Sequence, residues 1–147
     1  MIRKAESKEL DRLEQLWLHA AVSSHPSLPR GFWLERVHQF RRDCRRAGLC
    51  LVFTGRHPAV AEAFVTLLDQ DRLAHLCVSP LFAGCGIGAS LVAAAGHGKP
   101  QLQTRVLREN LRTRYFLQRY GFVETGRRHC VEYGQPLILM RCSSLPA

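Results

Sequence analysis

Apolar residues near the start of the chain recur at helical spacing. Between residues 10 and 21 they fall three or four positions apart and predict an amphipathic helix, with Ser7 as its N-cap; they are Leu10, Leu13, Leu16, Trp17, Ala20 and Ala21. Prolines at positions 26 and 29 end this helix. A second helix is predicted over residues 31–47, ended by Gly48 as its C-cap, with an apolar side made of Phe32, Trp33, Val37, Phe40 and Cys44.

From residue 49 onward, short apolar runs alternate with turn residues, which is typical of strands. The pattern predicts a short first strand at residues 1–5, a meander at 49–54, 59–68 and 72–78, and later strands at 102–107, 122–127 and 137–142. Two helices separate the later strands, one ending near residues 96–98 and one running from its cap Asn110 to Tyr120. This order of elements predicts a single α/β (α+β) domain over residues 1–147.

A glycine-rich turn joins the strand at 72–78 to the helix that follows, with glycines at positions 84, 86 and 88. Glycine lets the backbone approach a ligand closely, and the first N–H groups of a helix lack internal partners and favour an anion. The turn lacks the Gly-Lys-Ser/Thr ending of a P-loop, and its glycines are spaced too evenly for the dinucleotide fingerprint. A phosphate site is therefore one interpretation, and a tight turn without a ligand is the alternative.

Composition limits the class of protein and the cellular compartment to be expected. A chain of 147 residues with 46% hydrophobic residues is long and apolar enough to bury the core of one domain. No apolar run approaches the roughly 20 residues of a membrane helix, and residues 1–6 lack the apolar core of a signal peptide, so we expect a cytoplasmic protein without membrane contact. The net charge of +9, mostly from arginine, attracts anions such as CoA phosphates, acidic proteins or nucleic acid.

Six cysteines show no pair at metal-ligand spacing, so we predict no metal site and expect small buried thiols in a reducing compartment. Cys85 differs because it lies in the glycine-rich turn. There a helix dipole would lower its pKa and make the thiol oxidisable.

The residues around the turn resemble the acetyl-CoA loop of the GNAT N-acetyltransferase family: Val78-x-Pro80, then Gly84-x-Gly86-Ile87-Gly88. Further on, Asn110, Phe116 and Gly121-Phe122 resemble the second family signature, at the usual separation and in the usual order. The resemblance extends through His25-Pro26 to residues 1–5 and is to small bacterial acetyltransferases of the YiaC/YjaB type. It implies a mixed, mostly antiparallel sheet of about six to seven strands with helices on both faces, whose fourth and fifth strands splay apart.

The same resemblance implies where acetyl-CoA binds. The backbone of Leu76 and Val78 would pair with the pantetheine arm, and Asn110 and Phe116 would lie near the far end of that arm. The backbone N–H groups of the turn would hold the pyrophosphate: Ala83, Gly84, Cys85, Gly86, Ile87, Gly88 and Ala89. The family usually has Gln or Arg at the position of Ala83, so one donor is missing here. Three arginines that flank the last helix could reach the phosphates, namely Arg108, Arg112 and Arg114.

Two further departures concern catalysis. The tyrosine that often protonates the departing thiolate is replaced by Leu117, and the glutamate that serves some relatives as a base is replaced by Arg105, which stays protonated. His75 and Glu62 remain as candidate bases and Tyr120, about 60° round the helix, as a candidate acid. His25 and Arg105 are candidates for substrate binding. Each has a simpler alternative role, in packing or on a solvated face.

The motifs favour an acetyl-CoA-dependent N-acetyltransferase that acts by direct transfer to a primary amine, which could be a protein lysine, a protein N-terminus or a small molecule. Ala83, Leu117 and Arg105 support an alternative, a catalytically impaired GNAT domain that serves as an acyl-CoA sensor or interaction module. Nucleic-acid binding rests on charge alone, and the aromatic residues fall at core spacing rather than on a stacking platform. The expected partners are acetyl-CoA and an amine, for a monomer or homodimer.

Overall fold

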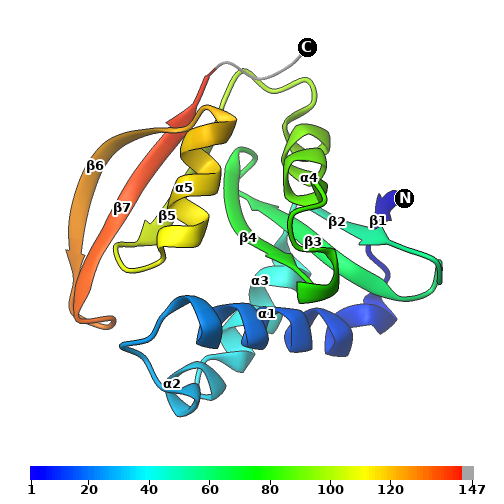
Figure 1. The fold of residues 1–147 in the computed structure, drawn as a ribbon, viewed down its shortest axis with the longest axis horizontal. Coiled ribbons are helices and arrows are strands. Elements are labelled where there is room, and N and C mark those ends of the chain that lie inside the picture. Colours follow the sequence, from blue (N-terminus) through cyan, green and yellow to red (C-terminus); the bar gives the residue numbers. More distant parts are fainter. Residues whose placement is uncertain (144–147) are drawn as a thin grey trace.

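The computed structural model describes residues 1–143, whose strands form one seven-stranded sheet in the order β1-β2-β3-β4-β5-β7-β6 (Figure 1). The strands are β1 (Ile2–Lys4), β2 (Leu49–Thr54), β3 (Ala61–Leu68), β4 (Arg72–Val78), β5 (Leu102–Leu107), β6 (Val123–Cys130) and β7 (Gln135–Cys142). Neighbouring strands are antiparallel except β4 and β5, which run parallel. The expected mixed, mostly antiparallel sheet is confirmed.

Helices cover both faces of this sheet, as expected. They are the short 3-10 helices η1 (Ser7–Glu9) and η2 (Pro80–Phe82), and the α-helices α1 (Leu10–Ser24), α2 (Arg30–Leu34), α3 (Val37–Arg46), α4 (Ile87–Gly96) and α5 (Leu111–Tyr120). On one face, α1, α2 and α3 contribute Trp17, Trp33 and Phe40 to a buried cluster with β3. On the other face, α4 and α5 contribute Leu91 and Leu117 to a second cluster.

The sheet divides between β4 and β5. These strands pair only at Arg72–Gln103 and Leu73–Thr104, and the pairing ends there. The Thr104 hydroxyl donates to the Leu73 carbonyl oxygen at 2.8 Å, at the closed end of the gap. Figure 1 shows the result, with β5, β7 and β6 forming one arm of the molecule and β1 to β4 the other. Beyond Leu73, the inner edge of β4 is left without a neighbouring strand.

The helix predicted over residues 31–47 is in fact two helices, because the chain breaks at Glu35–Arg36. The Arg36 N–H donates to the Trp33 carbonyl at 2.9 Å, which tightens the last turn of α2. The Arg36 guanidinium lies 3.5 Å from the centre of the Phe32 ring and bonds Glu132 at 2.9 Å. Hydrophobic spacing continued through the break, so the periodicity alone did not reveal it.

Both predicted caps of the early helices are also wrong. Ser7 lies inside η1, and the N–H of Glu6 is satisfied instead by the carboxylate of Glu9 at 2.8 Å. The same carboxylate accepts two bonds from Arg3, at 2.8 and 2.9 Å, so it links β1 to the start of the helix. Gly48 does not adopt positive φ. The helix α3 ends at Arg46, and its C-cap Ala47 has a non-helical ψ of 132°, which leads the chain through Gly48 into β2.

Within residues 1–143, the helices are too short or too polar to cross a membrane.

Candidate active site

The turn between β4 and α4 requires glycine at three positions for two different reasons. Gly84 and Gly86 have φ of +78° and +77°, and residues that carry a side chain rarely adopt such positive φ values. Gly88 instead lies against α5, where a Cβ would come within 3.3 Å of the Phe116 ring. The glycines therefore shape the turn and bring α5 close to it.

This turn presents a group of unpaired backbone N–H donors. Two of its seven N–H groups fold back on η2, since Ala83 donates to Pro80 and Cys85 to Phe82, both at 3.3 Å. The other five have no hydrogen-bond partner within residues 1–143: Gly84, Gly86, Ile87, Gly88 and Ala89. Three of these N–H groups belong to the first turn of α4, whose dipole favours an anion. The turn thus supplies five donors for a phosphate group rather than the seven expected from the sequence.

A cavity of about 460 Å³ lies beside these donors, between α1, β4 and α5. Its lining includes the turn, Leu76, Val78 and Phe116. Two arginines of α5 also line it, Arg112 and Arg119, and they provide positive charge where Ala83 offers none. Arg114 and Arg108 do not line this cavity, and the Arg114 guanidinium donates to the Arg108 carbonyl at 2.8 Å.

The inner edge of β4 is open along this cavity. The Ser79 N–H donates to the Glu62 carbonyl at 2.8 Å and so faces β3. Because successive residues of a strand alternate in direction, the N–H and C=O groups of Leu76 and Val78 face the gap towards β5. This open edge has the geometry to pair with an extended molecule that carries amides.

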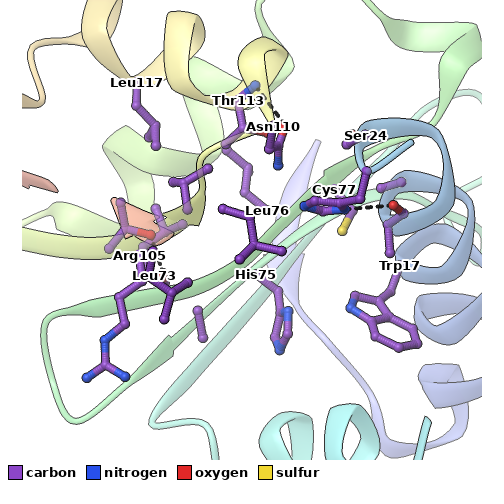
Figure 2. A pocket seen from close by; sticks show the side chains of 18 of the residues that line it. Trp17, Ser24, Leu73, His75, Leu76, Cys77, Arg105, Asn110, Thr113 and Leu117 are labelled. Carbon is purple, nitrogen blue, oxygen red and sulfur yellow. Dashed lines mark hydrogen bonds between the residues drawn. The ribbon is translucent and has the colours of Figure 1, made fainter. Parts of the chain in front are cut away.

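A second, smaller cavity of about 220 Å³ lies between β4 and β5 (Figure 2). In Figure 2, Asn110, Thr113 and Leu117 approach it from α5 and its cap, and Trp17 and Ser24 lie across from them on α1. The two cavities meet, because both are lined by the same five residues: Ala20, Ser24, Leu76, Cys77 and Thr113. The two cavities are therefore adjacent along β4.

Asn110 is the N-cap of α5, as predicted, and Leu117 lies within this helix. The Asn110 side chain caps the helix by accepting the Thr113 N–H at 3.2 Å, and it lines the smaller cavity, whereas Phe116 lines the larger one. Leu117 is only 1% exposed and forms part of the wall of the smaller cavity. No hydroxyl therefore stands at the position where the family often has tyrosine.

His75 lines the smaller cavity but is held on the side of α3. Its Nε2 lies 3.2 Å from a carboxylate oxygen of Asp43, and its ring packs edge-on against Phe40. In Figure 2 the ring points away from Asn110 and Thr113. Burial alone would raise the pKa of Asp43, but hydrogen bonds from His75 and Gln39 hold that pKa below its ordinary value. Asp43 is thus an ionised partner for one nitrogen of His75.

Glu62 and Tyr120, the other two catalytic candidates, line neither cavity. Glu62 is ion-paired with Arg12 of α1 at 3.1 Å, because it lies on the face of β3 that α1 covers. Tyr120 is packed between Phe116 and Phe122, and burial raises the pKa of its phenol. Glu62 thus lies in a partly buried ion pair rather than on a solvated face, and Tyr120 has the simpler role of a packed ring.

Arg105 lies at the rim of the smaller cavity and points away from Asn110 and Thr113 (Figure 2). Burial and the charges of Arg72 and Arg128 lower its pKa. Neither Arg105 nor Arg128 forms an ion pair within the described part of the chain. Arg105 therefore brings a positive charge to this rim that no ion pair within residues 1–143 neutralises.

His25 lines the smaller cavity from the loop after α1. Its side chain is buried, its Nδ1 lies 2.7 Å from the Ala21 carbonyl oxygen, and its ring packs 4.8 Å from that of Trp33. Burial lowers the pKa of His25, which favours the neutral ring.

Three other residues of the site were not among the sequence candidates. Tyr133 lines the smaller cavity from the turn between β6 and β7, and burial raises its pKa. Cys77 lines both cavities, and complete burial raises the pKa of its thiol, so the thiol stays protonated. Glu109 does not line the cavity but holds the loop of His25, as described below. Only their positions in the folded chain mark these residues, since tyrosine in a turn and cysteine in a strand carry no local signal.

The Cys85 thiol and the possible metal ligands are the last features of this region. The Cys85 thiol is exposed and lies 3.9 Å from the Ala83 carbonyl oxygen, outside the cavity lining. Within residues 1–143, no group of three or more His, Cys, Asp or Glu side chains is arranged to hold a metal ion.

Comparison with known proteins identifies the family to which this chain belongs. Residues 34–144 match the model of the acetyltransferase (GNAT) domain family, which is more than half of the chain. The chain belongs to the GNAT family. The resemblance inferred from the glycine turn and Asn110 is confirmed. This GNAT chain is an acetyltransferase that uses acetyl-CoA and an amine acceptor, and the alternative of a domain that only binds acyl-CoA is not favoured.

The GNAT chain is similar to two curated proteins of Escherichia coli (strain K12). It is 27% identical to peptidyl-lysine N-acetyltransferase YjaB over 99% of this chain and 97% of YjaB. It is 28% identical to peptidyl-lysine N-acetyltransferase YiaC over 83% of this chain and 82% of YiaC. The solution structure of apo-form YjaB has a TM-score of 0.83 at 24% identity and covers 99% of this chain and 98% of YjaB.

A third similar protein was solved with its ligand. PaiA N-acetyltransferase from Thermoplasma acidophilum, in complex with coenzyme A, has a TM-score of 0.76 at 16% identity, covering 97% of this chain and 98% of PaiA. At this identity the likeness is one of fold. The five free N–H donors, the open edge of β4 and the adjoining cavity of this chain fit a CoA thioester.

Proposed function

We propose that this acetyltransferase acts on the side-chain amine of lysine in proteins, by direct transfer from acetyl-CoA. The observation that carries the proposal is the meeting of the two cavities at β4. The smaller cavity has apolar walls from Leu73, Leu107, Leu117 and Leu137, which suit the aliphatic stem of a lysine. The printed names of YjaB and YiaC, both peptidyl-lysine N-acetyltransferases, support the same acceptor.

The larger cavity is proposed as the site of acetyl-CoA. Leu76 and Val78 pair with the pantetheine amides through the open edge of β4, and the five free N–H groups of the turn hold the pyrophosphate. Phe116 lies beside the arm, and Arg112 and Arg119 attract the phosphates in place of the side-chain donor that Ala83 lacks. When bound, acetyl-CoA supplies the activated acetyl group.

Direct transfer is favoured because the cavities offer no thiolate to carry the acetyl group. Cys77 is the cysteine that lines them, and its buried thiol stays protonated. The absence of tyrosine at Leu117 does not prevent the reaction, because a thiolate with an ordinary pKa near about 8.5 is an adequate leaving group without an acid. The chain then contributes position and exclusion of water, which supply much of an enzymatic rate.

The charged rim is proposed to select acceptors. Arg105 and Arg128 form no ion pair within the described residues. With Arg72, which pairs with Asp69, they line a third cavity that shares Thr104 and Arg105 with the smaller cavity. A lysine flanked by acidic residues would be attracted to this rim, whereas one flanked by basic residues would be repelled. The net charge of +9 acts in the same direction at longer range.

We also propose that residues 1–147 form one domain of a cytoplasmic bacterial enzyme, acting as a monomer or homodimer. The similarity to E. coli enzymes over nearly the whole chain supports this setting.

Peptide acetylation tests the acceptor. Purified protein and acetyl-CoA are incubated with peptides that carry a blocked N-terminus and a single lysine, flanked either by acidic or by basic residues, and products are followed by mass spectrometry. We expect acetyl-lysine, with a lower KM for the acidic peptide and a difference that shrinks as salt is added. A control peptide with arginine in place of lysine should stay unmodified.

Two outcomes would overturn the proposal. One is transfer only to peptides with a free N-terminal amine, and the other is no transfer to any lysine peptide.

A further inference from the structure

The acceptor cavity needs a group that can take a proton. A lysine has an ordinary pKa of about 10.4, so at neutral pH its ammonium must lose a proton before the nitrogen can attack a thioester. Five titratable side chains line this cavity: His25, His75, Cys77, Arg105 and Tyr133. Arg105 remains charged, and the raised pKa values of Cys77 and Tyr133 keep both protonated. The two histidines are the remaining candidates.

Hydrogen bonds distinguish these two histidines. Nε2 of His75 already faces the Asp43 carboxylate at 3.2 Å, on the side of α3. In His25 it is Nδ1 that is engaged, at 2.7 Å from the Ala21 carbonyl oxygen. A carbonyl oxygen only accepts hydrogen bonds, so Nδ1 must carry the hydrogen and Nε2 of the neutral ring must carry the lone pair. Nε2 of His25 has no hydrogen-bond partner among the described residues.

The loop that carries His25 is fastened to the far side of the cavity. The Ser27 N–H donates to the Glu109 carboxylate at 2.9 Å, and the Ser27 hydroxyl donates to its other oxygen. Gln135 also donates to this carboxylate through its side-chain amide, and its oxygen accepts the Glu109 N–H at 3.0 Å. Trp33 packs against the imidazole ring. These contacts fix the ring and place a negative charge near it, which would stabilise the imidazolium.

We propose that His25 is the general base of acetyl transfer, with Nε2 accepting the proton of the acceptor ammonium. The proposal rests on the proposed function of the two cavities. The ammonium gives one proton to Nε2, and the neutral nitrogen forms a bond to the acetyl carbonyl carbon as the carbon–sulfur bond breaks. The second proton lost by the nitrogen balances the charge of the departing thiolate. His25 returns its proton to solvent, so the products are an amide, a thiol and one proton.

The pH dependence of the rate follows from the surroundings of His25. Trp33 of α2 packs against its ring, and the charge of Glu109, in the loop before α5, acts on it. The other titratable groups of the cavity are His75 and Cys77 of β4, Arg105 of β5, and Tyr133 in the turn after β6. Burial is the largest influence and lowers the pKa of His25, while Glu109 opposes it. A base must be unprotonated, so kcat/KM should fall as the pH drops through this lowered pKa.

The test compares His25→Asn with His38→Asn. Asparagine at position 25 can still donate to the Ala21 carbonyl but offers no base, whereas His38 is an exposed residue of α3 outside both cavities. We expect His25→Asn to lower kcat by about 10²- to 10⁴-fold, to leave the Kd of acetyl-CoA unchanged and to abolish the acidic limb of the pH profile. Added imidazole should restore part of the rate. His38→Asn should behave as the wild type.

The outcomes separate this inference from the proposed function. A wild type that acetylates no lysine peptide overturns the proposed function, and the same two variants are then compared on the amine that it does acetylate. The inference is overturned if His25→Asn, folded and binding acetyl-CoA, keeps the wild-type kcat or the wild-type acidic limb. It is also overturned if no amine is acetylated at all.

Discussion

The two cavities of this enzyme differ in the groups that they present: one presents mainly backbone N–H groups and the other mainly side chains. The proposed cofactor cavity takes its donors from one continuous stretch of backbone, residues 84–89, in which glycines set the conformation. The proposed acceptor cavity is lined by side chains from many parts of the chain: α1, the loop of His25, α2, β4, β5, α5, the turn between β6 and β7, and β7. Backbone N–H groups are present whatever the side chains are, so the first site survives substitutions that keep its conformation. The chemistry of the second site depends on the identity of the side chain at each position.

This difference explains the departures from the family pattern. The loss of a side-chain donor at Ala83 leaves five backbone donors and two arginines of α5 in place. Leucine at 117 and arginine at 105, by contrast, remove whole chemical groups from the acceptor cavity. The chain can then catalyse transfer only through other groups that the fold brings there, and His25 is the one whose geometry suits a base.

The largest effect is expected from a substitution that distorts the backbone of the glycine-rich turn and leaves every native side chain in place. In Gly86→Val, a β-branched residue must adopt φ near +77°, which costs roughly 1–3 kcal/mol. Because the free N–H groups converge only in this conformation, the Kd of acetyl-CoA should rise by about 10- to 100-fold in calorimetric titration.

A matched control separates strain from binding. Gly98 has φ of +75° in the turn after α4, with no atoms near its Cβ position and outside both cavities. Gly98→Val should lose similar stability but keep the wild-type Kd. Equal loss of affinity in both variants would contradict the role assigned to the turn.

An intermediate effect should appear only at the acceptor site. Glu109→Gln removes one of the two acceptor oxygens that hold Ser27 and Gln135, so the loop of His25 loosens. We expect the KM of the lysine peptide to rise about tenfold, which corresponds to ~1.4 kcal/mol, with the Kd of acetyl-CoA unchanged. The exposed pair of Glu124 and Arg127 on β6 offers a control, Glu124→Gln, which should alter neither constant.

The same carboxylate gives a pH prediction for stability. Burial alone would raise the pKa of Glu109, but the bonds from Ser27 and Gln135 hold it below its ordinary value. Its contribution is therefore present above the ordinary pKa of glutamate and is lost as the pH falls through the lower folded value. Denaturation midpoints of wild type and Glu109→Gln should converge in that acidic range; a constant difference would contradict the assignment.

The smallest effect concerns the point where the two arms of the sheet join. Thr104 and Thr66 are both buried, but the Thr104 hydroxyl bonds Leu73 and that of Thr66 has no partner among the described residues. Thr104→Val should lower the free energy of unfolding by about 1 kcal/mol, and Thr66→Val should leave it unchanged or raise it by up to about 1 kcal/mol. Urea denaturation measures both, and identical changes would show that the Thr104 bond contributes nothing.

The sequence patterns correctly predicted those features of the fold that depend on residues close together in the chain. The strand bounds at 49–54, 72–78 and 102–107, the cap at Asn110 and the glycine turn all follow from residues within a few positions of each other. The break before Val37 did not follow, because Arg36 is held by Phe32 and by Glu132, which is distant in sequence. Glu62 and Tyr120 lie outside both cavities. Arg12, which is distant in sequence, pairs with Glu62, and Tyr120 packs against Phe122.

By itself the sequence determined the order of the strands along the chain, the glycine-rich turn and the resemblance to an acetyltransferase family. These depend on backbone conformation and short spacing, which neighbouring residues impose. Only the tertiary structure decided that Nε2 of His25 has no partner within residues 1–143, that Tyr133 and Cys77 line the smaller cavity, and that Glu109 holds the loop of His25. The physical reason is that the protonation, burial and direction of a side chain depend on partners that folding brings from distant parts of the chain.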